Sequence, residues 1–172
     1  RGYHNISREL HMFHPLSSLV FAHLLQLGLR PLQAQVPVAD PLLRLATAVD
    51  QVWFDGTTGQ IVVIELKVTD TDGYRSAGSN MLRPLQTVVN SCHNQYQLQL
   101  LLTDHMFRRT FGLDNTRALL VRVTTSGVHT TPLDAWCIKY QSAILEKLQH
   151  RRRQVIRGTP HTIQTSSNKS GI

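Results

Sequence analysis

Residues 61–68 read Ile-Val-Val-Ile-Glu-Leu-Lys-Val, and this stretch decides the fold. Its β-branched residues predict a strand that is buried on both faces. Side chains alternate across a strand, so Glu65 and Lys67 share one face while Leu66 points to the other. A carboxylate and an amine in so apolar a run are costly unless they face each other or a polar cleft. The stretch therefore predicts a central strand with a paired Glu and Lys at one end.

A second candidate strand lies just upstream, at residues 48–54, and the run Asp55-Gly56-Thr57-Thr58-Gly59 predicts a tight hairpin between the two. Folding this hairpin brings Asp50 towards the level of Glu65. Two carboxylates near a lysine can hold Mg²⁺ or Mn²⁺ through oxygen ligands and leave positions open for water and a phosphate. The pattern indicates metal-dependent phosphodiester hydrolysis. The alternative is a structural Glu–Lys pair at the end of a surface hairpin.

Two motifs in this part of the chain resemble one enzyme family. Val49-Asp50 with Glu65-Leu66-Lys67 resembles the catalytic signature of the PD-(D/E)xK nuclease superfamily, with valine where the name has proline. Residues 99–112 resemble a helix of its RecB-type and lambda-exonuclease-like members, which carries Gln followed four residues later by Tyr. Gln99 matches that motif, and Thr103 stands at the tyrosine position. The similarity runs roughly over residues 29–136 and includes a further core strand at residues 117–123.

The resemblance implies an α/β domain with a restriction-endonuclease-like mixed central sheet of four or five strands flanked by helices. It implies that Asp50, Glu65 and the backbone carbonyl of Leu66 hold one or two Mg²⁺ or Mn²⁺ ions. Lys67 would then orient the attacking water, and Gln99 would hold the substrate backbone or Lys67. Cleavage of DNA is favoured, by an exonuclease rather than an endonuclease. An RNA-cleaving nuclease of the same fold and an inactive nucleic-acid-binding module are the alternatives.

The N-terminal third predicts a helix followed by a strand. Apolar residues recur at helical spacing over residues 15–29. Related nucleases often use a Glu or His of this helix as a metal ligand, which makes His23 a candidate and His14 its reserve. A hydrogen-bonded core histidine is the competing interpretation of His23. Residues 33–38 predict the first strand of the sheet, and Pro37 favours an edge or a bulge there.

A long loop is expected from Thr69 to Val89, with a short helical turn near residues 85–89, because the segment is rich in Thr, Asp, Gly and Ser. This loop begins where the strand with Glu65 ends, and it is expected to lie over the cleft. On the helix that follows, Gln95 and Gln99 share a face one turn apart. For Gln95 we favour an ordinary solvated helix face over a contact with nucleic acid.

Positive charge is concentrated near the C-terminus. Residues 1–133 carry 11 basic and 9 acidic side chains, whereas residues 134–172 carry 7 basic and 2 acidic ones. A helix is predicted from Asp134 to about Gln154. The four arginines at its end either stabilise the helix terminus or bind phosphates; they are Arg151, Arg152, Arg153 and Arg157. Residues 158–172 predict a flexible polar tail, so residues 1–157 are expected to form the nuclease-like domain.

Composition fits one small domain, because 172 residues with 41% hydrophobic side chains can bury one core but not two. No apolar run approaches the ~20 residues of a membrane span, so no membrane partner is expected. The two cysteines suit reduced, partly buried thiols, and an intracellular location is predicted. The chain begins with Arg1, which leaves open a processed product or a part of a larger chain or complex.

Overall fold

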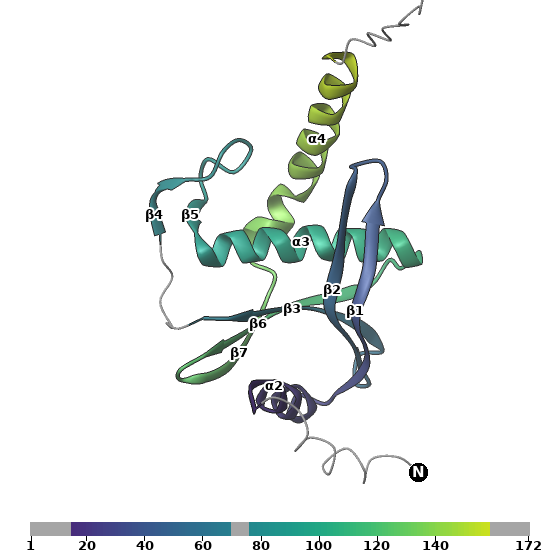
Figure 1. Cartoon of the computed structure of the whole chain (residues 1–172), viewed down its shortest axis with the longest axis vertical. Helices are drawn as coiled ribbons and strands as arrows, with labels where there is room; N and C mark the ends of the chain where they lie inside the picture. The colour runs from purple at the N-terminus through teal and green to yellow at the C-terminus, as the bar shows by residue number, and fades with distance from the viewer. Residues whose placement is uncertain (1–14, 70–75, 159–172) are drawn as a thin grey trace, which may run out of the picture.

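The computed structural model describes residues 15–69 and 76–158, which form a mixed α/β structure (Figure 1). A five-stranded sheet in the order β1-β2-β3-β6-β7 lies at its centre, flanked by helices. The predicted mixed central sheet is confirmed. The elements along the chain are α2 (Pro15–Gln26), β1 (Leu29–Asp40), β2 (Leu45–Asp55), β3 (Gln60–Val68), β4 (Ser76–Asn80), β5 (Val89–Ser91), α3 (Cys92–Phe111), β6 (Thr116–Thr124), β7 (Gly127–Pro132) and α4 (Ala135–Gly158).

The sheet is mixed because β3 and β6 pair in parallel, whereas the β1–β2, β2–β3 and β6–β7 pairs are antiparallel. A parallel pair requires a crossover between its strands. Here the crossover contains the small β4–β5 sheet and then α3, the 20-residue helix that crosses one face of the central sheet. This connection brings α3 over β3.

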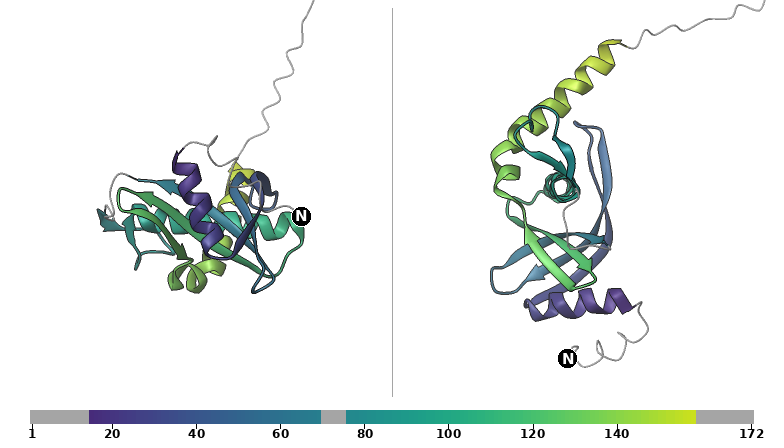
Figure 2. Two further views of the ribbon diagram at one scale, coloured as in Figure 1. Left: turned by 90° about the horizontal axis from the view of Figure 1, so that it is seen from below. Right: turned by 90° about the vertical axis from the view of Figure 1, so that its left-hand side faces the viewer.

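Two helices cover opposite faces of the sheet (Figure 2). On one face, Val20 and Leu24 of α2 pack with Val62 and Ile64 of β3. On the other face, Met106 and Phe107 of α3 pack with Val63 and the valines of β1 and β2. Strand β3 is thus buried on both faces, as its β-branched sequence predicted. Glu65 and Lys67 have the same parity as Val63, so they face α3.

Strand β1 is an edge of the sheet, which agrees with the position predicted from Pro37. The β-bulge or irregularity in its pairing with β2 lies between Pro31 and Gln33. The predicted hairpin between β2 and β3 is also confirmed. The Asp55 carboxylate accepts the Thr57 and Thr58 N–H groups at 2.9 and 3.2 Å, which fixes the turn that sets the β2–β3 register.

The segment predicted as a long loop at residues 69–89 contains more structure than expected. Strand β4 pairs with β5 in a separate two-stranded sheet. Near residues 85–89 the backbone forms turns instead of the predicted helical turn, with the Val88 N–H donating to the Leu85 carbonyl at 2.9 Å. β4 reads Ser-Ala-Gly-Ser-Asn and has no apolar alternation, so its residues do not predict a strand.

The helix predicted around Gln99 is α3, which begins after Ser91 and ends at the left-handed Gly112 (φ 64°). The C-terminal helix is α4, which extends to Gly158 instead of ending near Gln154. Side chains from residue 153 onwards, the expected tail after Gly158 and His14 lie outside the described residues. Strand β7, which the sequence analysis did not predict, completes the sheet. In the described ranges, no helix combines the length and apolarity that membrane crossing requires.

Candidate active site

The side chains predicted to act together lie where β2 and β3 stop pairing. The antiparallel ladder ends at the pair Gln51–Ile64, so Asp50 and Glu65 are the next residues on their strands. The Asp50 Oδ2 accepts the Leu66 N–H at 2.8 Å. This bond fixes the Asp50 carboxylate against the backbone that carries Glu65. The hairpin register therefore brings together the two carboxylates that are 15 residues apart in sequence.

Lys67 is held between β3 and α3 by two oxygen atoms. Its Nζ lies 2.6 Å from the Glu65 Oε1 and donates to the Gln99 Oε1 at 3.1 Å. Glu65 is only 2% exposed, whereas Gln99 lies on the exposed face of α3. The Lys67 ammonium is thus fixed at the boundary between the core and solvent. Charge-assisted hydrogen bonds of this kind are short and directional, so the amine has a defined position.

Burial raises the pKa of Glu65 above the usual value for a glutamate. The hydrogen bond and the positive charge from Lys67 oppose this effect, and the negative charge of Asp50 adds to it. Two carboxylates close together in a partly dry site repel each other unless a cation lies between them or one takes up a proton. The arrangement is therefore suited to a bound cation in addition to Lys67.

A divalent ion fits the donor set at this position. The Asp50 and Glu65 carboxylates supply oxygen donors, the kind of ligand that Mg²⁺ and Mn²⁺ prefer. Mg²⁺ usually binds through one or two carboxylates and keeps several waters, or takes substrate phosphate oxygens in their place. Among the described residues, no group of three or more His, Cys, Asp and Glu side chains gathers to form a closed site. An ion at this position would keep coordination sites open for substrate.

Tyr96 is a site residue that sequence reasoning missed. The Lys67 Nζ lies 5.2 Å from the centre of the Tyr96 ring, within the range of a cation–π contact. Tyr96 precedes Gln99 by three residues on α3, so both side chains reach Lys67. Thr103, which occupies the tyrosine position of the nuclease motif, is only 2% exposed. The aromatic group beside the lysine is thus Tyr96, one turn before Gln99 on α3, and does not come from position 103.

His23 is not brought to this site. It lies on α2, which packs against the sheet face opposite to that of Glu65 and Lys67. The interpretation of His23 as a metal ligand assumed that α2 covers the same face as the carboxylates, and it does not. Within the described ranges, the buried His23 Nε2 has no hydrogen-bond partner.

Gln95 is exposed on α3 and donates from its amide to the Asn90 Oδ1 at 2.8 Å. It thus lies one turn from Gln99 without contacting Lys67. The nearby Gln97 was not singled out from the sequence, and it is fully buried. Its amide donates to the Pro132 carbonyl at 3.0 Å and its Oε1 accepts the Asp134 N–H at 3.0 Å. Gln97 therefore joins α3 to the connection between β7 and α4.

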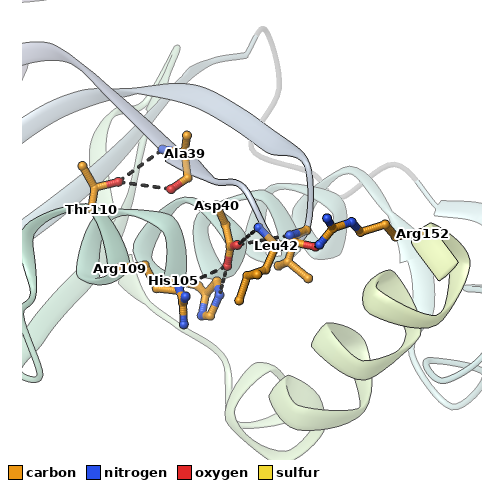
Figure 3. A network of polar contacts seen from close by, with 8 residues as sticks. Ala39, Asp40, Leu42, His105, Arg109, Thr110 and Arg152 are labelled. Atoms are coloured by element: carbon orange, nitrogen blue, oxygen red, sulfur yellow. Dashed lines mark hydrogen bonds and ion pairs between the residues drawn. The ribbon is translucent and has the colours of Figure 1, made fainter. Parts of the chain in front are cut away.

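The C-terminal arginines divide into separate environments. Arg151 is exposed, whereas the Arg152 Nη1 donates to the Leu42 carbonyl in the β1–β2 turn (Figure 3). The Arg153 and Arg157 side chains belong to the part of α4 whose side chains are not described. Figure 3 also shows Asp40, which binds His105 and Arg109 of α3. Arg152 therefore helps to hold α4 near the β1–β2 turn.

Comparison with known proteins leaves the family open. No family model and no curated protein sequence match the chain. The solved structure of SSO0001 is 15% identical, with a TM-score of 0.36 over 92% of this chain and 70% of its own. A protein from Eubacterium rectale named "Putative exonuclease" is 15% identical, with a TM-score of 0.40 over 73% of this chain and 44% of its own. At these scores neither likeness carries weight for function.

Proposed function

We propose that this chain is a metal-dependent nuclease that hydrolyses phosphodiester bonds at Asp50, Glu65 and Lys67. The observation that carries the proposal is the gathering of four predicted residues from three elements at one end of the β2–β3 ladder. Asp50 binds the Leu66 N–H, and Lys67 bridges Glu65 and Gln99. A structural Glu65–Lys67 pair would need neither a second carboxylate beside the end of the β2–β3 ladder nor an amide from α3.

In this mechanism Asp50, Glu65 and the carbonyl of Leu66 would hold the ion. A bound Mg²⁺ or Mn²⁺ would neutralise the scissile phosphate and lower the pKa of a bound water. Lys67 orients the attacking water and stabilises the negative charge that develops on the phosphoryl oxygens. Gln99 fixes the amine through its Oε1, so that the charge is already in position when the transition state forms.

Tyr96 limits the movement of the same amine. Its ring lies beside the Lys67 Nζ, so the ammonium has an aromatic wall on one side and oxygen acceptors on the others. A fixed cation loses less entropy on reaching the transition state than a mobile lysine does. Tyr96 is therefore a positioning residue in the proposed mechanism.

DNA is the favoured substrate and exonucleolytic cleavage the favoured mode, because the Gln99 helix resembles that of DNA exonucleases in the superfamily. An RNA-cleaving enzyme is the second candidate, since a metal site of this kind attacks the phosphate and does not read the sugar. A catalytically inactive binding module is the third. The presence of two carboxylates and a lysine at one end of the β2–β3 ladder favours turnover over binding alone.

A substrate panel tests the proposal. Labelled single-stranded and double-stranded DNA and RNA are incubated with the protein in Mg²⁺, Mn²⁺ or EDTA, and linear and circular forms are compared. We expect cleavage of DNA with either metal, none in EDTA, and little cleavage of circles. Cleavage of RNA alone would show that the enzyme is a ribonuclease. Cleavage of circular DNA would show that it is an endonuclease.

A matched pair of variants ties any cleavage to this site. Glu65→Gln removes the buried carboxylate charge, whereas Glu146→Gln removes an exposed one on α4. The first variant should be inactive and the second should retain the wild-type rate. If Glu65→Gln cleaves as fast as Glu146→Gln at equal metal concentration, the activity does not come from the proposed site.

A further inference from the structure

A basic groove lies between the β4–β5 segment and α4, outside the candidate active site. Its volume is about 490 Å³, within the range of small-molecule sites. Three cations line it: Arg83 from the turn before β5, and Lys147 and Arg151 from α4. Its apolar wall is formed by Met81, Leu85, Leu98, Ile144 and Leu148. None of the residues that line the groove is acidic.

The three cations are available to a ligand. Arg83, Lys147 and Arg151 are all exposed. None of them forms an ion pair with a described side chain, whereas Arg108, Arg109 and Arg117 are each paired with an aspartate. Lys147 and Arg151 are four residues apart on α4, so they lie on one face of the helix. Among the described residues, the groove therefore presents three cations without an ion-pair partner above an apolar wall.

A row of polar side chains runs from the groove towards the candidate active site. Asn90 lines the groove and accepts a hydrogen bond from Gln95. Gln95 and Gln99 are exposed one turn apart on α3, and Gln99 accepts from Lys67. In Figure 1 this half of α3 lies between the β4–β5 segment and β2. A strand leaving Lys67 would thus cross the exposed face of α3 and reach the groove.

We propose that the groove binds single-stranded nucleic acid, with phosphates against Arg83, Lys147 and Arg151 and an unpaired base against the apolar wall. The direction of the strand rests on the proposed nuclease function, because it places the scissile phosphate at Lys67. A duplex would meet the cations with its backbone but would keep its bases stacked away from the wall. Proteins that hold single strands combine a positively charged groove with side chains against which unpaired bases pack; these are usually aromatic, and here they are aliphatic.

Binding is measured first in EDTA, where no cleavage takes place. The probe is a short fluorescein-labelled single-stranded DNA, and fluorescence anisotropy is recorded at several salt concentrations. The triple variant Arg83→Gln/Lys147→Gln/Arg151→Gln should bind about a hundredfold more weakly at 0.1 M salt, and its salt slope should fall by about 2, from ~0.7 per lost contact. All three residues are exposed, so the variant should melt as the wild type does.

A matched pair on one helix separates a local contact from general attraction. Lys147→Gln should weaken binding about fivefold, the value for one lost phosphate contact at 0.1 M salt. Lys139→Gln removes an exposed charge two turns earlier on α4, outside the groove, and should leave binding within twofold. Equal losses in the two variants would overturn the proposal, because they would show attraction by net charge alone.

Three probes test the ligand class. An abasic strand should bind more weakly than the normal strand. Equal binding would show that no base packs against the apolar wall. Duplex DNA should bind more weakly than the single strand. Polyglutamate should not compete at equal charge concentration; effective competition would reassign the groove to an acidic protein partner.

The same variants distinguish failure of the groove from failure of the nuclease. If the groove variants weaken binding in EDTA but the wild type does not cleave in Mg²⁺, the groove proposal stands and the nuclease proposal is wrong. If the wild type cleaves but the triple variant binds as tightly as the wild type, the nuclease proposal stands and the groove proposal is wrong. If both proposals hold, the triple variant should have a raised KM and a nearly unchanged kcat.

Discussion

At the scale of single residues, the candidate site combines a buried carboxylate with a partly exposed amine. Glu65 is held in a strand whose neighbouring residues are apolar, and its charge is compensated by Lys67 at 2.6 Å. Burial and the nearby Asp50 nevertheless leave the pKa of Glu65 raised. The folded protein therefore tolerates the ionised site at a cost in stability. Active sites frequently carry such a cost.

This cost predicts that Glu65→Gln stabilises the protein in EDTA at neutral pH. A carboxyl group whose pKa is raised in the folded state favours folding below its unfolded pKa, and this contribution is lost as pH rises through the folded pKa. The variant should therefore melt at a higher temperature than the wild type at neutral pH, and the difference should vanish in acid. Thermal melts across this pH range measure it. A lower melting temperature for Glu65→Gln at neutral pH would contradict the assigned direction.

Lys67→Ala should abolish cleavage while leaving metal binding intact. In the proposed mechanism the amine supplies charge to the transition state, whereas Asp50, Glu65 and the Leu66 carbonyl would hold the metal. Cleavage rates and Mn²⁺ titrations of the same preparation separate the two effects. Lys139→Ala serves as the control, because it removes an exposed lysine of α4. Retained activity in Lys67→Ala would eliminate the proposed role of the amine.

Gln99→Ala should lower kcat by about ten- to a hundredfold, the range typical for loss of a group that orients an active-site residue. Its Oε1 holds the Lys67 Nζ at 3.1 Å, so the amine keeps only the Glu65 oxygen after the change. The control is Gln26→Ala at the exposed end of α2, on the other side of the sheet. Unchanged kinetics in Gln99→Ala would mean that the hydrogen bond has no part in turnover.

The sequence predicted that Asp50, Glu65 and Lys67 lie close together because their positions follow from local rules, whereas Gln99 was predicted from the resemblance of its helix to a nuclease motif. Strand alternation sets Glu65 and Lys67 on one face, and the short hairpin sets Asp50 opposite them. Tyr96 could not be predicted, because its contact depends on how α3 is rotated over the sheet. The prediction of His23 as a metal ligand missed the position of α2 for a related reason. Apolar spacing shows that a helix is packed but not which face of the sheet it covers.

At the scale of elements, α3 is the component that completes the site, and both of its ends are anchored. Near its N-terminus, Gln97 binds the β7–α4 connection. Near its C-terminus, His105 and Arg109 bind the Asp40 carboxylate at the end of β1 (Figure 3). These contacts fix the position of the helix along the sheet, and Gln99 depends on that position to reach Lys67.

Asp40→Asn should destabilise the protein by about 1–3 kcal/mol, the usual cost of disrupting buried hydrogen bonds to charged groups. Burial alone would raise the pKa of Asp40, but hydrogen bonds from His105 and the Leu43 and Leu42 N–H groups, with the charge of Arg109, lower it. A carboxyl with a lowered pKa contributes stability above its unfolded pKa and loses it as pH falls through the folded pKa.

The difference in free energy of unfolding between wild type and Asp40→Asn should therefore shrink in strong acid. Chemical denaturation at neutral and acid pH measures this dependence. Asp114→Asn, at an exposed position, is the matched control and should change little at either pH. A constant difference across pH would show that the amide disturbs packing instead of removing a stabilising charge.

The bounds of buried helices and strands were predicted more closely than those of exposed ones. β3 and β6 are apolar on both faces, and α2 shows helical spacing, so each was found close to its observed bounds. β4 and β7 were missed because they are short and polar and lie outside the centre of the sheet. Their pairing depends on neighbouring strands, which local sequence does not encode.

At the scale of the whole molecule, the two proposed functional surfaces lie on different parts of the fold. The candidate active site combines β2, β3 and α3, whereas the basic groove combines the β4–β5 segment with α4. The sequence located the positive charge in the C-terminal quarter but treated the four arginines as one patch. Folding instead ties Arg152 to Leu42 and brings Arg151 together with Arg83, which is 68 residues away in sequence.

The claim on which the proposed mechanism depends is that Asp50 and Glu65 together hold a divalent ion. Titration with Mn²⁺, followed by the electron paramagnetic resonance signal of the free ion, measures this binding without any substrate. The wild type and Lys67→Ala should remove Mn²⁺ from solution with similar affinity, whereas Asp50→Asn and Glu65→Gln should bind it at least tenfold more weakly, because an amide lacks the charge that holds a hard cation. Equal Mn²⁺ affinity in all four proteins would contradict the account.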